Sequence, residues 1–249
     1  MRLTTDALII RENNNIGESD RFVTALTREW GAVHASARGA RTLKNRGSVA
    51  TRLLSYSRLT LREGRNRDKY IIEDARPLRV FFDIHGDIAR LTLAQYFCEL
   101  AGVLAPREEP AEEHLRLLLN ALHFLSEGKK DIPLIKAVVE LRLLTLSGYM
   151  PDLTACSVCR GGADGPVWFL PRDGILRCNR CEKPGDALPL TPALLAAMRH
   201  IVYAPFEKCF AFQVPQETAS ALTQTVETFL LCQLGRNFQT LQFYHGLDA

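Results

Sequence analysis

The chain lacks the segments that mark membrane proteins and the motifs that mark many enzymes. Its 249 residues contain no run of 18 apolar residues, and the first ten residues show no signal-peptide core. The motifs of P-loop ATPases, zincin proteases, α/β-hydrolases and dinucleotide-binding enzymes are missing too. We therefore expect a cytoplasmic binding protein rather than an enzyme, although a metal-dependent nuclease site that assembles only in space stays open.

Cysteine is sparse except in two C-x-x-C pairs, which are separated by an 18-residue span. These four residues are Cys156, Cys159, Cys178 and Cys181. The spacing is typical of one tetrahedral zinc ion, and four thiolates leave no open position for a substrate, so we expect one structural Zn²⁺. Two disulfides, a redox C-x-x-C or unrelated core cysteines are the alternatives. A zinc deaminase is disfavoured because no histidine is followed two residues later by glutamate.

The span between the two cysteine pairs has the pattern of a β-ribbon. Val167–Leu170 predicts a strand, residues 171–174 a turn, and residues 175–177 a second strand that leads into Cys178. We expect the ribbon to occupy residues 153–187. Three further cysteines have apolar neighbours and are expected in the core: Cys98, Cys209 and Cys232.

A net charge of +3 conceals a marked asymmetry along the chain. Residues 1–80 hold sixteen Lys and Arg against nine Asp and Glu, whereas the remainder holds fifteen against nineteen. Much of the positive charge falls in two predicted loops, at Arg38, Arg41, Lys44 and Arg46, and at Arg65, Arg67 and Lys69. Such residues suit contact with the phosphates of a nucleic acid, with an ordinary solvated surface as the alternative.

The first 80 residues have the pattern of a small β-barrel. Strands are predicted at 7–11, 22–27, 32–37, 53–62 and 70–73, with glycines between them. Five short strands favour an OB-fold, which commonly binds oligonucleotides, over an SH3-like barrel. Few aromatic residues are available for stacking on bases, chiefly Phe22, Trp30, Tyr56 and Tyr70, and the barrel core also needs some of them.

Residues 81–249 change to a helical pattern. Helices are predicted at 84–103, 111–126 and 132–148, and two more begin at Pro192, which Thr191 precedes as a cap, and near Pro215. The predicted fold class is α+β. It combines an N-terminal five-stranded OB-fold domain, at 1–80, with an all-helical domain, at 81–249, that carries the zinc ribbon as an insertion.

This order of parts resembles the family of the bacterial recombination mediator RecO. The resemblance rests on stretches at 16–20, 27–31 and 37–41, and on Leu146-Ser147-Gly148-Tyr149-Met150-Pro151 running into the first cysteine pair, with Asp173-Gly174 ahead of the second. Two positions depart from the family pattern. Arg160 stands where a glycine commonly follows the second cysteine, and Asn45 stands where a serine often follows the basic-loop lysine.

The resemblance implies a nucleoid-associated DNA repair and recombination mediator. Such a protein binds single- and double-stranded DNA, anneals complementary strands, and works with RecR to load RecA onto strands coated by the single-strand-binding protein SSB, whose acidic C-terminal tail it would bind. A zinc-ribbon transcription or translation factor remains the alternative function.

Overall fold

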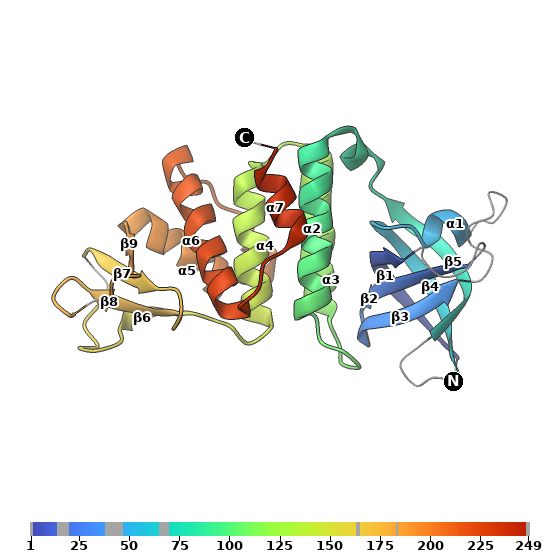
Figure 1. Cartoon of the computed structure of the whole chain (residues 1–249), viewed down its shortest axis with the longest axis horizontal. Coiled ribbons are helices and arrows are strands. Elements are labelled where there is room, and N and C mark those ends of the chain that lie inside the picture. Colours follow the sequence, from blue (N-terminus) through green and yellow to red (C-terminus); the bar gives the residue numbers. More distant parts are fainter. Residues whose placement is uncertain are drawn as a thin grey trace. The chain divides into compact units, whose positions relative to one another are not determined.

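The computed structural model describes residues 2–13, 20–37, 47–64, 70–162, 165–182 and 184–247 (Figure 1). The chain divides into two compact units. The first comprises Met1–Lys129 together with Phe238–Ala249, and the second comprises Lys130–Asn237. No helix in the described ranges is both long and apolar enough to span a membrane.

The first unit begins with a closed five-stranded barrel. Its strands are β1 (Arg2–Asn13), β2 (Arg21–Thr27), β3 (Gly31–Ala37), β4 (Ser55–Glu63) and β5 (Tyr70–Val80), and α1 (Gly47–Ala50) lies between β3 and β4. The order around the barrel is β1-β2-β3-β5-β4, with β3 and β5 paired in parallel and the other neighbours antiparallel. The prediction of an OB-fold barrel is confirmed.

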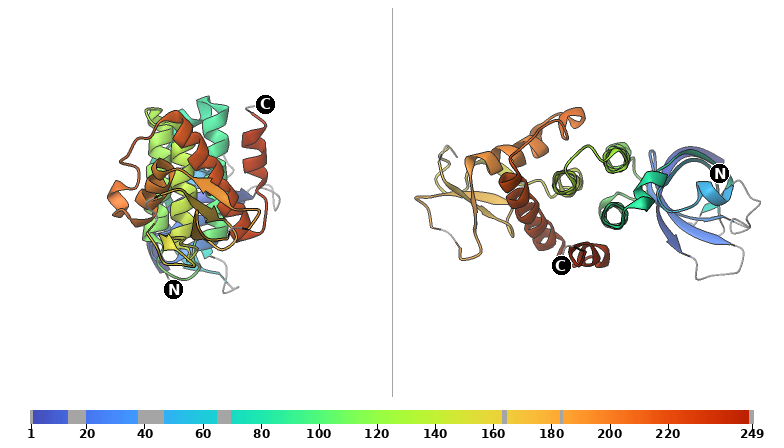
Figure 2. Two further views of the ribbon diagram at one scale, coloured as in Figure 1. Left: turned by 90° about the vertical axis from the view of Figure 1, so that its left-hand side faces the viewer. Right: turned by 90° about the horizontal axis from the view of Figure 1, so that it is seen from above.

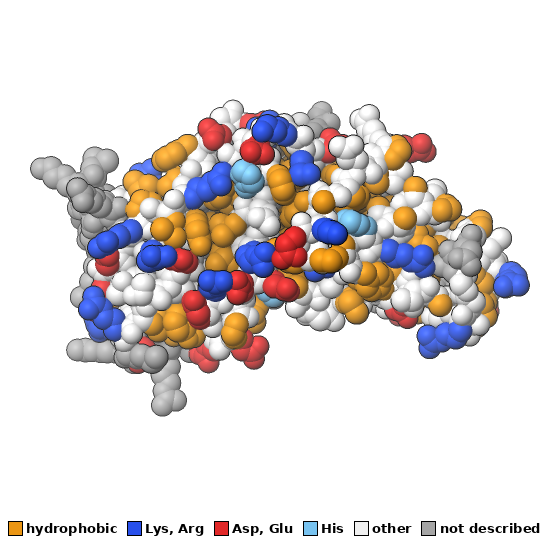
Figure 3. Space-filling model, turned by 180° about the vertical axis from the view of Figure 1, so that it is seen from behind, with side chains coloured by type: hydrophobic (Ala, Val, Ile, Leu, Met, Phe, Trp, Pro, Cys, Tyr) orange, Lys and Arg blue, Asp and Glu red, His pale blue; other side chains and the backbone are white. Residues whose placement is uncertain are grey.

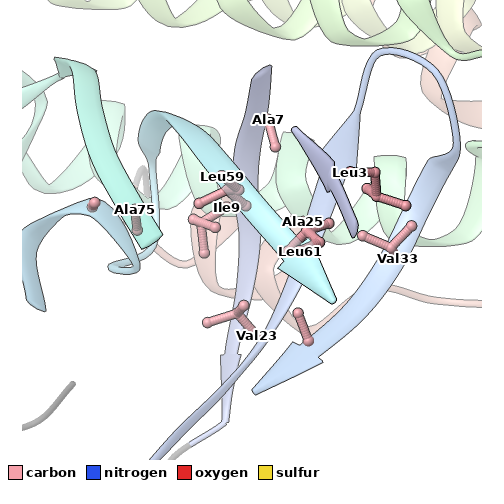
Figure 4. Packing of buried hydrophobic residues seen from close by; sticks show 11 residues of the cluster. Leu3, Ala7, Ile9, Val23, Ala25, Val33, Leu59, Leu61 and Ala75 are labelled. Carbon is pink, nitrogen blue, oxygen red and sulfur yellow. The ribbon is translucent and has the colours of Figure 1, made fainter. Parts of the chain in front are cut away.

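Small and branched apolar side chains fill the barrel (Figure 4). In β1, Ala7 and Ile9 point inward, and Leu59 and Leu61 of β4 meet them, as the two-residue period of strands requires. Strand β5 extends to Val80 and is longer than the predicted 70–73. The prediction ended too early because Ala75 is the one buried residue of this strand. A strand with a mostly exposed surface gives little apolar signal in the sequence.

The first unit also contains η1 (Phe82–Gly86), α2 (Ile88–Leu104), α3 (Glu112–Glu127) and α7 (Gln239–His245). Of these, α2 and α3 pack against β1 and β2 of the barrel, and α7 packs against α2 (Figure 2). Asp87 ends the 3₁₀ turn and caps α2 by accepting hydrogen bonds from the N–H groups of Ala89 and Arg90, so the helix begins at Ile88 and not at the predicted residue 84. The C-terminal helix returns to α2, where Phe238 meets Tyr96 edge-on at 5.7 Å.

The second unit joins three helices to a four-stranded ribbon. Its helices are α4 (Ile132–Leu146), α5 (Pro192–Tyr203) and α6 (Gln216–Leu234), with the 3₁₀ turn η2 (Phe206–Lys208). The ribbon strands β6 (Asp152–Cys156), β7 (Val167–Leu170), β8 (Ile175–Cys178) and β9 (Leu188–Leu190) lie in the order β6-β8-β7-β9. Thr191 caps α5 as predicted, accepting a hydrogen bond from the N–H of Leu194.

A fully buried lysine ties α4 to α6. Lys136 Nζ lies 2.7 Å from Glu140 Oε1 and 2.6 Å from Glu227 Oε2. Burial lowers the pKa of Lys136, but the two carboxylates outweigh it and the net shift is upward. The charged pairing can therefore persist inside an apolar bundle, where loss of one partner would leave an uncompensated charge.

The three cysteines outside the ribbon do not all lie in the core. Cys98 and Cys209 are buried as predicted, whereas Cys232 is exposed, so that prediction was wrong for Cys232. The buried residues of α6 follow a helical stripe through Leu222, Val226 and Phe229, and position 232 falls outside it.

The hairpin between β2 and β3 fastens the barrel to the segment ahead of α3. The N–H of Ala32 donates to the carbonyl of Pro106 at 2.9 Å, and the N–H of Glu108 donates to the carbonyl of Trp30 at 3.1 Å. Gly31 has φ +60°, and a Cβ built there would lie 2.0 Å from the carbonyl oxygen of Pro106. This backbone contact therefore requires glycine for both its conformation and its space.

Replacement of Gly31 by alanine should destabilise the first unit. The left-handed backbone alone costs about 1–3 kcal/mol for a residue with a side chain, and displacement of Pro106 adds to that loss. Chemical denaturation would measure the change. Gly86→Ala is the matched control, because a Cβ at Gly86 meets no atom within 4 Å. Equal stability of the two variants would contradict the importance of this contact.

Candidate metal centre and nucleic-acid interface

The four ribbon cysteines converge on one point. Their Sγ atoms all lie within 4.8 Å of one another, and those of Cys159 and Cys178 are 3.7 Å apart. Tetrahedral coordination with metal–sulfur bonds of about 2.3 Å requires sulfur separations of roughly 3.8 Å. A disulfide would need about 2.05 Å, and all seven cysteines are free thiols. This geometry suits a metal ion and not the alternative of two disulfides.

Two tight turns aim the sulfur atoms. In the first turn, Arg160 donates its N–H to the carbonyl of Cys156 at 3.0 Å, and in the second Cys181 donates to Cys178 at 3.2 Å. Strand β6 pairs in parallel with β8, with Cys156 opposite Leu176, and the N–H of Ser157 donates to the carbonyl of Leu176 at 2.9 Å, which brings the second turn beside the first. The ribbon predicted from the sequence is thus the element that assembles the site.

Backbone dipoles favour thiolates at two of the four positions. The N–H groups of Cys159 and Cys178 lower the pKa of Cys156 to about 6, and the N–H of Arg180 lowers the pKa of Cys178. The pKa of Cys181 rises to about 12, first through its hydrogen bond with Cys178 and then through burial and the other sulfur atoms. Four thiolates this close together require a bound cation to offset their charge.

The ribbon is attached to the helices by polar and aromatic contacts. Arg199 of α5 donates from Nε to the carbonyl of Leu153 at 2.8 Å and from Nη2 to that of Thr154 at 3.1 Å. Phe169 of β7 meets Phe229 of α6 edge-on at 5.3 Å. The metal site therefore sits on a sheet that packs against the helices of its own unit.

All seven basic residues predicted to contact phosphates lie outside the described residues: Arg38, Arg41, Lys44, Arg46, Arg65, Arg67 and Lys69. The described part of residues 1–80 holds nine Lys and Arg against seven Asp and Glu. On the face shown in Figure 3, Lys and Arg side chains likewise alternate with Asp and Glu. Most of the positive excess of the first 80 residues is therefore carried by residues 38–46 and 65–69.

The barrel strands that flank these segments meet at one end. The last residue of β3, Ala37, pairs with Arg21 at the start of β2, and Tyr70 at the start of β5 pairs with both Ala35 and Glu63. Asn13 at the end of β1 pairs with Phe22 there as well. The described anchors of residues 14–19, 38–46 and 65–69 thus lie at the same end of the barrel.

A hollow of about 230 Å³ opens on the outer surface of β1, β2 and β3 near this end. It is lined by Arg11, Asn13, Phe22, Val23, Thr24, His34, Ala35 and Ser36. The side chains of Thr24 and His34 hydrogen-bond at 3.1 Å across the two strands. The hollow combines a cation, an aromatic ring and polar groups, which is a suitable set for an oligonucleotide.

Sequence reasoning named Phe22 but missed Arg11 and His34 as candidates for this surface. Arg11 lies outside the two basic loops, and a lone histidine in a strand carries little information. The sequence signal that could have identified His34 is the two-residue alternation of β3. His34 and Ser36 point away from the core, and Ala35 between them is buried.

One arginine of the first 80 residues, Arg21, stabilises the fold and is not a candidate for contact with a ligand. Arg21 is buried, with Nε 2.9 Å from Glu12 Oε1, and its Nη1 donates to the carbonyl of Ser48 at 2.6 Å and to Thr51 at 3.0 Å. The charge of Arg21 is thus neutralised inside the barrel. A count of charges along the sequence overstates the cations that a ligand can reach.

Comparison with known proteins agrees with this architecture. Residues 1–81 match the family model for the N-terminal part of recombination protein O, and residues 85–242 match the model for its C-terminal part. The chain belongs to the recombination protein O family. Residues 1–81 span the whole barrel, so the OB-fold is the N-terminal module of this family of DNA repair proteins.

Relatives in the RecO family cover almost the full chain. The DNA repair protein RecO of Acetivibrio thermocellus is 30% identical over 248 residues, covering 99% of this chain and 97% of the relative. That of Symbiobacterium thermophilum is 34% identical over 253 residues, covering 98% and 97%. That of Heliobacterium modesticaldum is 34% identical over 208 residues, covering 81% and 74%. The resemblance seen in the sequence is confirmed.

Replacement of Cys178 by serine should lower the metal content of the purified protein well below that of the unchanged chain. The variant should also melt at a lower temperature, because metal binding to structural four-cysteine sites contributes on the order of 10 kcal/mol to folding. Elemental analysis and thermal unfolding are the measurements. Cys232→Ser, at an exposed cysteine outside the cluster, should retain both properties. Unchanged metal content in Cys178→Ser would rule out the assigned ligand.

Proposed function

We propose that this RecO-family protein is a DNA recombination mediator that binds single- and double-stranded DNA and anneals complementary strands. The observation that carries the proposal is the barrel end at which the hollow and the anchors of both basic segments occur together. Because base pairing supplies the sequence recognition, the protein itself only has to hold and neutralise the strands.

Annealing on this surface begins with the phosphates. Two strands repel one another through their phosphate charges, and Lys and Arg side chains reduce that repulsion by displacing condensed counterions. This charge is supplied by Arg11 of the hollow and by Arg38, Arg41, Lys44, Arg46, Arg65, Arg67 and Lys69. Phe22 offers a ring on which an unpaired base can stack. Such binding tolerates any sequence and weakens steeply with salt.

The proposal extends to the partners implied by the family resemblance. With RecR, the protein loads RecA onto single strands coated by SSB, and it contacts the acidic C-terminal tail of SSB. It acts in the cytoplasm, associated with the nucleoid. These activities require no bond-making chemistry, so the protein acts as a mediator and not as an enzyme.

The metal assigned to the cysteine cluster is a single structural Zn²⁺. Four soft thiolate ligands in tetrahedral spacing suit zinc and leave no coordination position for water. When bound, the ion supplies cross-linking of the two turns and no catalysis. Cys156, Cys159, Cys178 and Cys181 hold the ribbon strands at their ends.

A zinc-ribbon transcription or translation factor is the competing function, and a metal-dependent nuclease is another. The first should prefer particular sequences or bind a polymerase or ribosome. The second should degrade DNA when Mg²⁺ or Mn²⁺ is supplied. Neither property is expected of a mediator that recognises phosphates.

Removal of single phosphate-binding charges should flatten the dependence of affinity on salt. Arg41→Ala and Arg11→Ala should each reduce the logarithmic slope by about 0.7 on single strands and about 0.9 on duplex DNA. Fluorescence anisotropy at several salt concentrations gives the slope. Arg76→Ala is the control, because Arg76 lies away from the Tyr70 end of β5 and is paired with Asp74 at 3.1 Å. An unaltered slope in both test variants would show that the DNA phosphates contact other residues.

The mediator function should appear as annealing of complementary oligonucleotides that are precoated with SSB. We expect the full chain to anneal them without a nucleotide cofactor, more slowly as salt increases, and more slowly when SSB lacks its C-terminal tail. Fluorescence transfer between labelled strands follows the reaction. Failure of the folded, metal-loaded protein to anneal even naked strands would refute the proposed function.

A further inference from the structure

The hollow on β1, β2 and β3 is built from two rows of side chains that cross the three strands. In the first row, Arg11 of β1 pairs with Thr24 of β2, and Thr24 pairs with His34 of β3. Side chains that are paired across neighbouring strands point to the same face of the sheet. Arg11 and His34 are both exposed, so this row presents a cation and a histidine with a hydroxyl between them.

The second row contains the aromatic ring. Asn13 of β1 pairs with Phe22 of β2, and Phe22 pairs with Ser36 of β3. Phe22 is half-buried, and the described side chains that fill the barrel do not include it. The ring therefore lies on the ligand face with a polar side chain on either side, which suits the flat face and polar edges of an unpaired nucleobase.

The spacing of the rows and the size of the hollow match one nucleotide. Val23 and Ala35 pair between the rows and point into the barrel, so the two rows are about 7 Å apart along the strands. One nucleotide can bridge such a distance between its base and its phosphate. The volume of about 230 Å³ also lies below the roughly 300 Å³ at which pockets for drug-sized ligands begin.

Thr24 can hold His34 in place whether or not the ring carries a proton. Thr24 Oγ1 and His34 Nδ1 lie 3.1 Å apart. A hydroxyl can either donate or accept a hydrogen bond, so it can bond to a neutral imidazole and to an imidazolium. Histidine is the side chain that ordinarily changes its charge between about pH 5 and pH 8. Proton binding would therefore add a charge to the row without removing the bond that orients the ring.

The other charged groups near His34 keep their charge over this range. Arg11 lies in the same row, and the residues of β2 in the hollow are uncharged. At the start of β3, the segment ahead of α3 brings Arg107 and Glu108. The described pairs of β5 with β3 begin at Tyr70, whose pKa is raised by burial and by two nearby carboxylates. Among these groups, a change in charge between about pH 7.5 and pH 5.5 comes from His34.

We propose that the hollow is a subsite for one unpaired nucleotide and that proton binding to His34 strengthens it. The base stacks on Phe22, and the adjoining phosphate lies at the row of Arg11 and His34. Protonated His34 adds a second cation to that row, so a single strand binds more tightly as the pH falls. By linkage, binding of the strand draws a proton onto His34. The inference rests on the proposed binding of DNA by the barrel and adds its regulation.

The rival explanation is that His34 only ties β3 to β2 through Thr24. His34→Gln would then lower the melting temperature and leave the pH dependence of DNA binding unchanged. The two explanations therefore differ in the pH profile and not in stability alone.

The test measures binding of oligothymidylate to the full chain by fluorescence anisotropy at about pH 7.5 and about pH 5.5. Thymine takes up no proton in this range. At about 0.1 M salt the unchanged chain should bind roughly fivefold more tightly at the lower pH, because one added phosphate contact contributes about 0.7 to the logarithmic salt slope. His34→Gln should lose this gain, and His34→Lys should bind tightly at both values. His85→Gln, at an exposed histidine of η1, is the control and should keep the gain.

Phe22→Leu tests the position of the base. It should weaken binding roughly fivefold or more at both pH values, as expected for loss of one stacked base, and should keep the gain at low pH. Phe82→Leu, at a phenylalanine of η1 that is 69% exposed, is the matched control. Circular dichroism at both pH values checks that each variant is folded. Unchanged affinity in folded Phe22→Leu would overturn the assignment of the base to this hollow.

Calorimetry in two buffers of different ionisation enthalpy measures proton uptake directly. Binding of oligothymidylate at about pH 6.5 should take up a fraction of a proton, and His34→Gln should take up less. A pH gain and proton uptake that persist in His34→Gln would overturn this inference while leaving DNA binding by the barrel intact. Absence of DNA binding at both pH values would refute both proposals.

Discussion

Closure of the barrel by a short parallel pairing is the interaction on which the proposed DNA surface depends. Only three pairs join β3 to β5, from Ala35 with Tyr70 to Ala37 with Ile72. Without them the sheet would stay open at these edges, and the flanks of residues 38–46 and 65–69 would not meet. Closure also removes two unpaired strand edges that could otherwise pair with other chains. The stability of the barrel and the approach of the residues that flank the two basic segments therefore have the same structural cause.

The ribbon needs a source of stability other than the one that closes the barrel. It is too small to bury a large core of its own, and its four thiols must be brought within a few ångströms of one another. A metal ion held by the four thiolates would supply the missing stabilisation, while Arg199 and Phe169 attach the sheet to α5 and α6. One face of the sheet is buried by this packing. The other face carries Trp168 and Arg177, which pair across β7 and β8.

Several charged residues of this chain serve the fold and not a ligand. Arg21 bonds inside the barrel and Lys136 inside the second unit, each with carboxylates to offset the cost of burial. Arg160 is the opposite case, because it is exposed and strained where glycine would suffice. Burial, and not residue type, identifies the charges that stabilise the fold.

The sequence by itself determined the elements that depend on local signals. The two C-x-x-C pairs with their turn, the cap at Thr191 and the five-strand barrel were all predicted, because spacing, capping and the two-residue period act over short stretches of chain. Tertiary structure alone decided the length of β5, the exposure of Cys232, the burial of Arg21 and Lys136, and the hollow that includes Arg11 and His34. Each of these depends on which distant strand or helix covers a side chain, and that information does not reside in the neighbouring sequence.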